Sequence, residues 1–276
     1  MSTKYNVNKN INVCSASTHV PPEIQADTLF SFVDKLDYII KPLRDKKVFP
    51  RYCQEDISYL KLQSIKNVMF PMKCFCDINL HRMHIHLRWY GYYGLAFTKE
   101  WGMNKGIQPL HYINKASMLS KDFSKVFKKA LSTKGAKSPK ELLDYKSFLL
   151  HELMFYKPYD GQMYCFSTGK KSKKCFMDEC EWRYVPQMTS TTMEKFIFDQ
   201  TIIDNSDLKR RMSDALELYD ELALSFEYSD LKYIIVKDED DFETLIDEID
   251  GFPISTIDKE RLVSKVIVWE ASKGDF

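Results

Sequence analysis

The stretch PMKCFCDINLHRMHIHLRWYGYYGLAFTKEW, residues 71–101, decides how the rest of this chain folds. Residues 72–78 alternate between two faces with the two-residue period of a strand. Gly91 and Gly94 permit a tight turn before a second strand over residues 95–98. Between the strands, four residues at helical spacing predict a helix with one buried face: Leu80, Met83, His84 and Leu87. The stretch therefore predicts a strand, a helix, a turn and a second strand.

The remaining patterns extend this unit into one α+β domain. At 276 residues, with 44% hydrophobic and 14% aromatic residues, the chain can bury a large core. Strands are predicted over residues 28–33, 107–113, 231–236 and 264–269, and helices over residues 36–43, 121–129, 138–152, 206–226 and 242–249. We expect a single domain over residues 28–276, with a mixed, largely antiparallel sheet flanked by helices, and an irregular polar arm over residues 1–27.

Two of these segments carry more detailed predictions. The helix over residues 138–152 begins with a serine cap and a proline at the first helical position. Its inward face is expected to be formed by Leu142, Leu143, Tyr145, Phe148 and Leu149. The polar run GKKSKK at residues 169–174 predicts the solvated tip of a hairpin.

Cysteine content and charge distribution bear on the location of the protein and on its partners. Seven scattered cysteines and an N-terminus without a signal-peptide core predict a reduced, cytoplasmic location. No apolar run approaches the roughly 18 residues that span a bilayer. Residues 227–276 carry fourteen Asp and Glu against six Lys and Arg, whereas the rest of the chain is basic. This asymmetry is compatible with a charged partner or with an ordinary solvated surface.

A second concentration of charge lies at residues 175–186, CFMDECEWRYVP. As one continuous strand, this segment would place Glu179, Glu181 and Arg183 on the same face. Two carboxylates and a guanidinium in that arrangement occur both in general acid and base sites and in structural ion-pair networks. The sequence leaves these two alternatives open.

Three other chemistries are less well matched by the sequence. A zinc site built from Cys74, Cys76, His81 and His84 fits no common ligand spacing, and the cysteines lie on the face expected to be buried. A cysteine nucleophile would need a paired histidine and a third orienting group. Nucleic-acid binding has a basic body in its favour but no module motif. We therefore expect no metal and no nucleic-acid partner.

The sequence resembles the AbiGi-type abortive-infection proteins of bacteria and phages. The resemblance is carried, in chain order, by residues 51–56 (RYCQED), 71–78 (PMKCFCDI), His86, 90–94 (YGYYG), 99–101 (KEW) and 179–186 (ECEWRYVP). It implies a role in phage defence as the antitoxin of a pair whose toxin is a nucleotidyltransferase-like protein, with a phage component as a further candidate partner. Family members tend to have His-Phe-Thr where this chain has Ser31, Phe32 and Val33.

A weaker likeness, to the His, Tyr, Glu layout of ADP-ribosyltransferases, implies an alternative function with NAD as cofactor. In that layout a tyrosine stacks on nicotinamide, a glutamate binds the adjoining ribose, and an arginine pairs with the pyrophosphate. The catalytic candidates are Glu179, Glu181, Tyr93 and His86, and the ligand-binding candidates are Ser31, Arg51, Tyr90 and Arg183. The transferase would use Tyr90 or Tyr93, Glu179 or Glu181, and Arg51 or Arg183 in one shared cavity, and a binding module would keep that cavity as a remnant of the fold. The sequence favours a neutralising or sensing partner over an NAD-dependent transferase, because Ser31 replaces the histidine.

Overall fold

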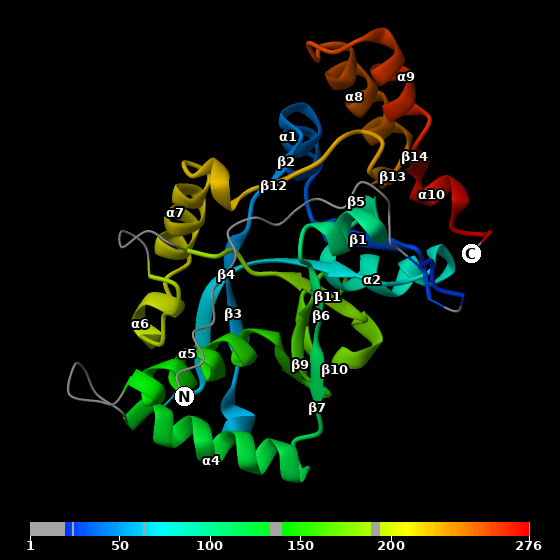
Figure 1. The fold of residues 1–276 in the computed structure, drawn as a ribbon. Coiled ribbons are helices and arrows are strands. Elements are labelled where there is room, and N and C mark those ends of the chain that lie inside the picture. Colours follow the sequence, from blue (N-terminus) through cyan, green and yellow to red (C-terminus); the bar gives the residue numbers. More distant parts are fainter. Residues whose placement is uncertain (1–19, 24, 63–64, 133–139, 189–193, 276) are drawn as a thin grey trace.

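The computed structural model describes residues 20–23, 25–62, 65–132, 140–188 and 194–275 (Figure 1). Residues 1–19 and 24 of the predicted N-terminal arm lie outside this part of the chain, and so do Ser138 and Pro139 at the predicted helix start. The fold is α+β, as the sequence predicts, and helices flank a mixed, largely antiparallel sheet. The domain boundary at residue 28 stays a prediction.

Eight strands of the described chain form the main sheet. Their spatial order is β14 (Val266–Val268), β13 (Leu231–Val236), β5 (Tyr93–Thr98), β1 (Thr28–Val33), β4 (Asn67–Cys76), β11 (Glu181–Tyr184) and β6 (Gln108–Pro109), with β3 (Arg51–Asp56) paired to β4. The pair β13–β14 is parallel, and the other pairs are antiparallel. The predicted strands at residues 28–33 and 231–236 are confirmed to the residue.

The long strand β4 connects two parts of the molecule. Its first half, residues 67–72, pairs with β3, whereas residues 73–76 pair with β11. Pro71 therefore lies inside the strand, although the sequence predicted a start at Met72. The two halves contribute to separate hydrophobic clusters, one against α4 (Met118–Ser132) and α5 (Lys140–Phe155) and the other against the centre of the sheet. In Figure 1, α4 and α5 lie at the end of the molecule opposite to α8 (Glu239–Asp250) and α9 (Thr256–Val263).

Strand register assigns side chains to the two faces of the sheet. Glu181, Cys76 and Phe30 are direct antiparallel partners across β11, β4 and β1, so their side chains share one face, called here the Glu181 face. Ser31 follows Phe30 on β1, and Lys73 lies three residues before Cys76 on β4. Both side chains therefore point to the opposite face, called here the Ser31 face. The Glu181 face is covered by α2 (Met83–Tyr90), and the Ser31 face by α1 (Asp37–Asp45), α3 (Lys99–Asn104), α8 and α9.

Three two-stranded sheets and three further α-helices complete the described fold. The sheets pair β9 (Asp160–Cys165) with β10 (Lys170–Cys175), β2 (Lys47–Val48) with β12 (Leu224–Ser225), and β7 (His111–Ile113) with β8 (Tyr156–Pro158). The helices α6 (Gln200–Ile203) and α7 (Ser206–Leu216) pack beside β3 and β4, and α10 (Trp269–Ser272) follows β14. Within the described ranges, no helix has the length and apolar character needed to cross a membrane.

Gly91 makes the turn between α2 and β5 possible, as predicted. Its φ of 112° lies in the region that side chains disfavour. A Cβ atom at this position would also lie 2.5 Å from the carbonyl oxygen of Val33. The close approach of this turn to the end of β1 positions the end of α2 over the Glu181 face.

Several element boundaries differ from the predictions. The strand predicted over residues 107–113 is two short strands in different sheets, because β6 pairs with β11 and β7 with β8. The helix predicted over residues 206–226 ends at Leu216, and the segment continues into β12. The run at residues 170–174 is part of strand β10 rather than a solvated tip, and Lys174 is buried.

Two predicted helix faces are also wrong. In α5, Leu143, Tyr145 and Phe148 are exposed, whereas Leu149 is buried as predicted; the side chain of Leu142 lies outside the described residues. In the segment around α2, Met83 and Leu87 are buried as predicted, but His84 is exposed and His86 is buried in its place. A 3-10 turn over Leu80–Arg82 precedes α2, and it shifts the phase of the helix face that the spacing of apolar residues had suggested.

Candidate functional site

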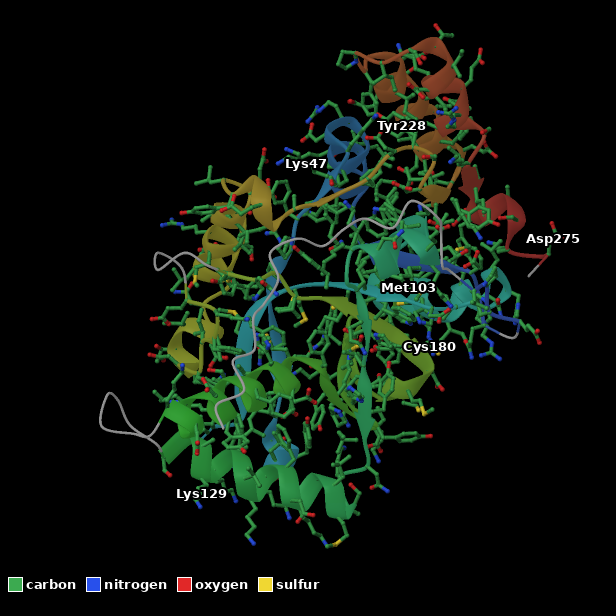
Figure 2. All side chains as sticks on the ribbon, viewed as in Figure 1. Lys47, Met103, Lys129, Cys180, Tyr228 and Asp275 are labelled. Atoms are coloured by element: carbon green, nitrogen blue, oxygen red, sulfur yellow. The ribbon has the colours of Figure 1, made fainter. Side chains whose placement is uncertain are left out.

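The acidic segment before β11 bends instead of forming one strand. Phe176–Glu179 forms a 3-10 turn, Cys180 has a φ of 43°, and β11 begins at Glu181 (Figure 2 labels Cys180). The prediction of a continuous strand over residues 175–186 is therefore wrong, because a left-handed cysteine cannot be inferred from alternation. Even so, Glu179, Glu181 and Arg183 converge, since the bend turns Glu179 toward the Glu181 face.

Six side chains join into a buried salt-bridge network in which positive and negative groups alternate. The sequence of contacts is Lys174, Glu179, Lys157, Glu181, Arg183 and Glu55. Lys157 Nζ donates to Glu179 Oε2 at 2.7 Å and to Glu181 Oε2 at 2.5 Å. Three cations balance three carboxylates, which satisfies the requirement that buried charges be paired.

Arg183 holds one end of the network. Its Nη2 donates to Glu181 Oε1 and to Glu55 Oε1, each at 2.8 Å, and its Nη1 donates to the carbonyl oxygen of Met154 at 2.5 Å. The side chain is fully buried, with its guanidinium 5.7 Å from the ring of Phe70. Arg183 therefore connects β11 to β3 and to the end of α5.

The electrostatics differ between the middle and the ends of the network. Burial alone would raise the pKa of Glu181, but Arg183 and Lys157 outweigh it and hold that pKa well below its usual range. At the ends burial prevails: it raises the pKa of Glu55 despite Arg183 and lowers the pKa of Lys174 despite Glu179. The middle of the network therefore stays ionised, and the ends are shifted toward their neutral forms.

Tyr90 and His86 on α2 lie beside the Lys174 end. Tyr90 donates its hydroxyl to Glu179 Oε1 and accepts from Lys174 Nζ at 3.2 Å. The His86 ring stacks 6.4 Å from that of Tyr90, and neither of its ring nitrogens has a hydrogen-bond partner in the described chain. Burial, reinforced by Lys174, lowers the pKa of His86 to about 4, so the ring is neutral at pH 7.

Five of the eight predicted site residues thus come together, and three do not. Ser31 lies on the opposite face of the sheet from Glu181, and Tyr93 also lies there and donates to Asp241 Oδ2 at 2.8 Å. Arg51 is exposed and pairs with Asp214 at 3.1 Å. Ser31 and Tyr93 are separated from the carboxylates because a one-residue offset along β1 or β5 reverses the face of a side chain. Their catalytic and ligand-binding roles stay predictions.

Three members of the network were not among the predicted site residues. Lys157 lies in a segment interpreted as a turn, and Lys174 in a run interpreted as solvated surface. Glu55 belongs to the segment at residues 51–56 and pairs with Arg183, which is 128 residues away along the chain. Because the three carboxylates of the network need three cations, a search for partners of Glu179 and Glu181 would have pointed to buried lysines.

The arrangement limits what Glu179 and Glu181 can do chemically. Both oxygens of Glu181 accept hydrogen bonds from cations, whereas Glu179 Oε2 accepts from Lys157 and Glu179 Oε1 accepts from Tyr90 and pairs with Lys174. Glu179 is 1% exposed and Glu181 is 4% exposed. A general base needs a lone pair within reach of the substrate. The geometry therefore favours the structural alternative that the sequence left open.

The zinc alternative is not supported by the positions of its residues. His81 and His84 are exposed, whereas Cys76 is buried under α2. Among the described residues, no group of three or more His, Cys, Asp or Glu side chains is arranged to hold a metal ion.

Comparison with known proteins assigns this chain to a family. Residues 46–237 match the family described as "Putative abortive phage resistance protein AbiGi, antitoxin". The chain belongs to the AbiGi family. A relative from Lactococcus lactis subsp. cremoris, the abortive phage resistance protein AbiGi, is 34% identical over 246 residues, which cover 82% of this chain and 98% of the relative. No solved structure matches the chain, so the ADP-ribosyltransferase likeness gains no support.

The AbiGi match confirms the resemblance seen in the sequence. It covers β3, β4, α2 and β11, and with them all six residues of the salt-bridge network. It supports a role in abortive-infection defence against phages.

Proposed function

We propose that this AbiGi protein is the neutralising or sensing partner in a two-component anti-phage system, acting in the cytoplasm on a nucleotidyltransferase-like toxin. The observation that carries this proposal is the exposed, uncompensated acidic surface of α8. The family description as an antitoxin agrees with it. A binding function also fits the salt-bridge network, whose carboxylates are already occupied by cations.

Helix α8 has an unusual distribution of charge. It contains no Lys or Arg, and six of its acidic side chains are exposed: Glu239, Asp240, Glu243, Asp247, Glu248 and Asp250. None of these six side chains forms an ion pair with another residue in the described ranges. The opposite side of the helix, with Leu245 and Ile249, packs into the core of the Ser31 face. The helix is therefore firmly attached and presents its charge to solvent.

Such a surface suits a basic protein partner. A toxin that handles nucleotides is expected to present positive charge to phosphate groups. Complementary potentials accelerate association and exclude partners of the same charge. An acidic helix fixed on a rigid core can cover a basic surface with little loss of conformational entropy.

The NAD-dependent transferase is not adopted as a second function. Ser31, which would bind the ribose, lies on the opposite face of the sheet from Glu181, Arg51 is paired with Asp214, and the other pyrophosphate candidate, Arg183, is fully buried and already bound to Glu181 and Glu55. Incubation with labelled NAD and cell extract is expected to leave no label on any macromolecule. Label that disappears in the Glu181→Gln variant would instead establish the transferase.

The partner proposal is tested by co-purification with the toxin-type protein encoded beside this chain. The triple variant Glu239→Lys, Asp240→Lys and Glu243→Lys is expected to weaken binding at least tenfold and to leave toxicity unrelieved in co-expression. The matched control reverses three exposed acids elsewhere, Asp204→Lys, Asp207→Lys and Glu221→Lys. Equal binding by both variants, or no binding by the unmodified chain, overturns the proposal.

A further inference from the structure

A pocket of about 190 Å³ opens on the Ser31 side of the sheet, away from the salt-bridge network. It lies between α1, the segment from β2 to the start of β3, and β4, and Figure 2 labels Lys47 at this place. Its apolar lining is formed by Val33, Tyr38, Pro42, Val48 and Phe49. A hollow of about 10 Å³ adjoins it and reaches Ser31 and Phe97. Lys73 lines both spaces.

The cations at the rim of the pocket form ion pairs, two of them with carboxylates outside the lining. Arg51 binds Asp214 at 3.1 Å and Lys47 binds Asp220 at 2.8 Å, while Lys41 binds Glu217. Asp37 is exposed at the start of α1. Of the four cations in the lining, three therefore have a carboxylate partner.

Lys73 is the fourth cation of the lining. Its ammonium makes no ion pair or hydrogen bond with any side chain in the described chain. Burial lowers its pKa, Arg51 opposes its charge, and no carboxylate acts on it. A lysine half-buried in this way is costly unless something else supplies the counter-charge.

We propose that this pocket binds a small organic anion, with its phosphate or carboxylate group on Lys73 and its apolar body against Tyr38, Phe49 and Val48. The volume agrees with this class, because a dry cavity of about 150 Å³ accommodates benzene. A flat body of about ten carbon atoms with one charged group fills the space. The aromatic and aliphatic lining then supplies contact area, and Lys73 fixes the orientation.

This site is independent of the proposed function. The pocket lies on the opposite face of the sheet from Glu181 and does not include the exposed acids of α8. A ligand in this pocket would contact α1 and also Lys47 and Val48 of β2, the strand that pairs with β12.

The test is calorimetric titration of the whole chain with four probes. They are 1-naphthyl phosphate, 1-naphthoate, neutral 1-naphthol and inorganic phosphate. We expect at least one of the two aromatic anions to bind at least tenfold more tightly than 1-naphthol and inorganic phosphate. The stronger of the two identifies phosphate or carboxylate as the preferred group. Failure of both aromatic anions to bind at millimolar concentration overturns the proposal.

Substitution distinguishes Lys73 from the other cations of the pocket. Lys73→Met is expected to weaken binding of the aromatic anion at least tenfold while leaving 1-naphthol binding unchanged. The matched control is Lys41→Met, because Lys41 lines the same pocket but is already paired with Glu217. Thermal unfolding of each variant verifies folding. Unchanged anion binding by folded Lys73→Met, or an equal loss in Lys41→Met, overturns the assignment.

Discussion

Lys157 and Lys73 lie against opposite faces of the same sheet, and their surroundings differ in one respect. Lys157 contacts two carboxylates, and although burial acts to lower its pKa, Glu181 and Glu179 raise it well above its usual value. Lys73 has no carboxylate, and burial lowers its pKa. The difference shows that burial of a charged side chain does not by itself indicate a functional site. A buried charge with all its partners is part of the scaffold, whereas one without a partner indicates a binding site.

The largest effect is expected where the network is broken at Arg183. Replacing Arg183 with Met removes the donor to Glu181 Oε1, to Glu55 Oε1 and to the carbonyl of Met154. Loss of one partner from a buried ion pair typically costs about 3–5 kcal/mol. Urea unfolding at pH 7 measures the change. Arg51→Met is the control, since an exposed ion pair contributes about 1 kcal/mol or less. A loss below that of the control would show that the network is not a scaffold.

A second effect concerns His86, the unpaired neutral group at the Lys174 end. Its folded pKa is about 4 and its unfolded pKa is about 6.5, so the unfolded chain takes up a proton first as pH falls. The free energy of unfolding should therefore decrease by about 3 kcal/mol between pH 7 and pH 4 on account of this group alone. His86→Phe should remove that part of the decrease. The groups facing His86 are Phe32, Tyr90, Glu179 and Lys174.

Chemical unfolding of both proteins across this pH range measures the difference. His84→Phe is the matched control, because His84 is exposed on the same helix and its loss removes no buried group. If the unmodified chain and His86→Phe lose equal stability on acidification, His86 is protonated in the folded state and its pocket is wetter than the geometry indicates.

The smallest expected effect is an increase in the free energy of unfolding rather than a decrease, and it tests the comparison of Lys73 with Lys157 most directly. Lys73→Met should raise the free energy of unfolding by about 1 kcal/mol, because it removes an uncompensated buried cation. In the unmodified chain the lowered folded pKa means that stability rises as pH increases toward 10.5, and the variant should lack this rise. Lys157→Met should instead be destabilising. Changes of the same sign in both variants would contradict the distinction between the two lysines.

The sequence was sufficient for the elements that have a clear period. The strands β1 and β13 are short, largely apolar segments with charged residues close to both ends, so their limits could be predicted to the residue. The turn at Gly91 could be predicted because glycine is the residue that its φ requires. Convergence of Tyr90 with Glu179 also followed from placing the late acidic segment beside α2.

The rest depends on contacts between segments distant in sequence. The bend at Cys180 is stabilised by tertiary surroundings, since a left-handed conformation is not favoured by cysteine itself. Lys174 belongs to a polar run, and its burial arises because Glu179 supplies a counter-charge at 2.6 Å. The exposed face of α5, with Tyr145 and Phe148, has the composition of a core and could not be distinguished from one by spacing.

The order in which the strands are synthesised has a consequence for biogenesis. The central strands β1, β4 and β5 leave the ribosome within the first hundred residues, but β11 pairs with β4 and β13 pairs with β5 only after residues 181 and 231. At a synthesis rate of about 5–20 residues per second, the edges of β4 and β5 remain without these hydrogen-bond partners for several seconds. Such edges are templates for aberrant association between nascent chains. The protein is therefore expected to need a holding chaperone during translation and to complete its sheet after β13 has emerged.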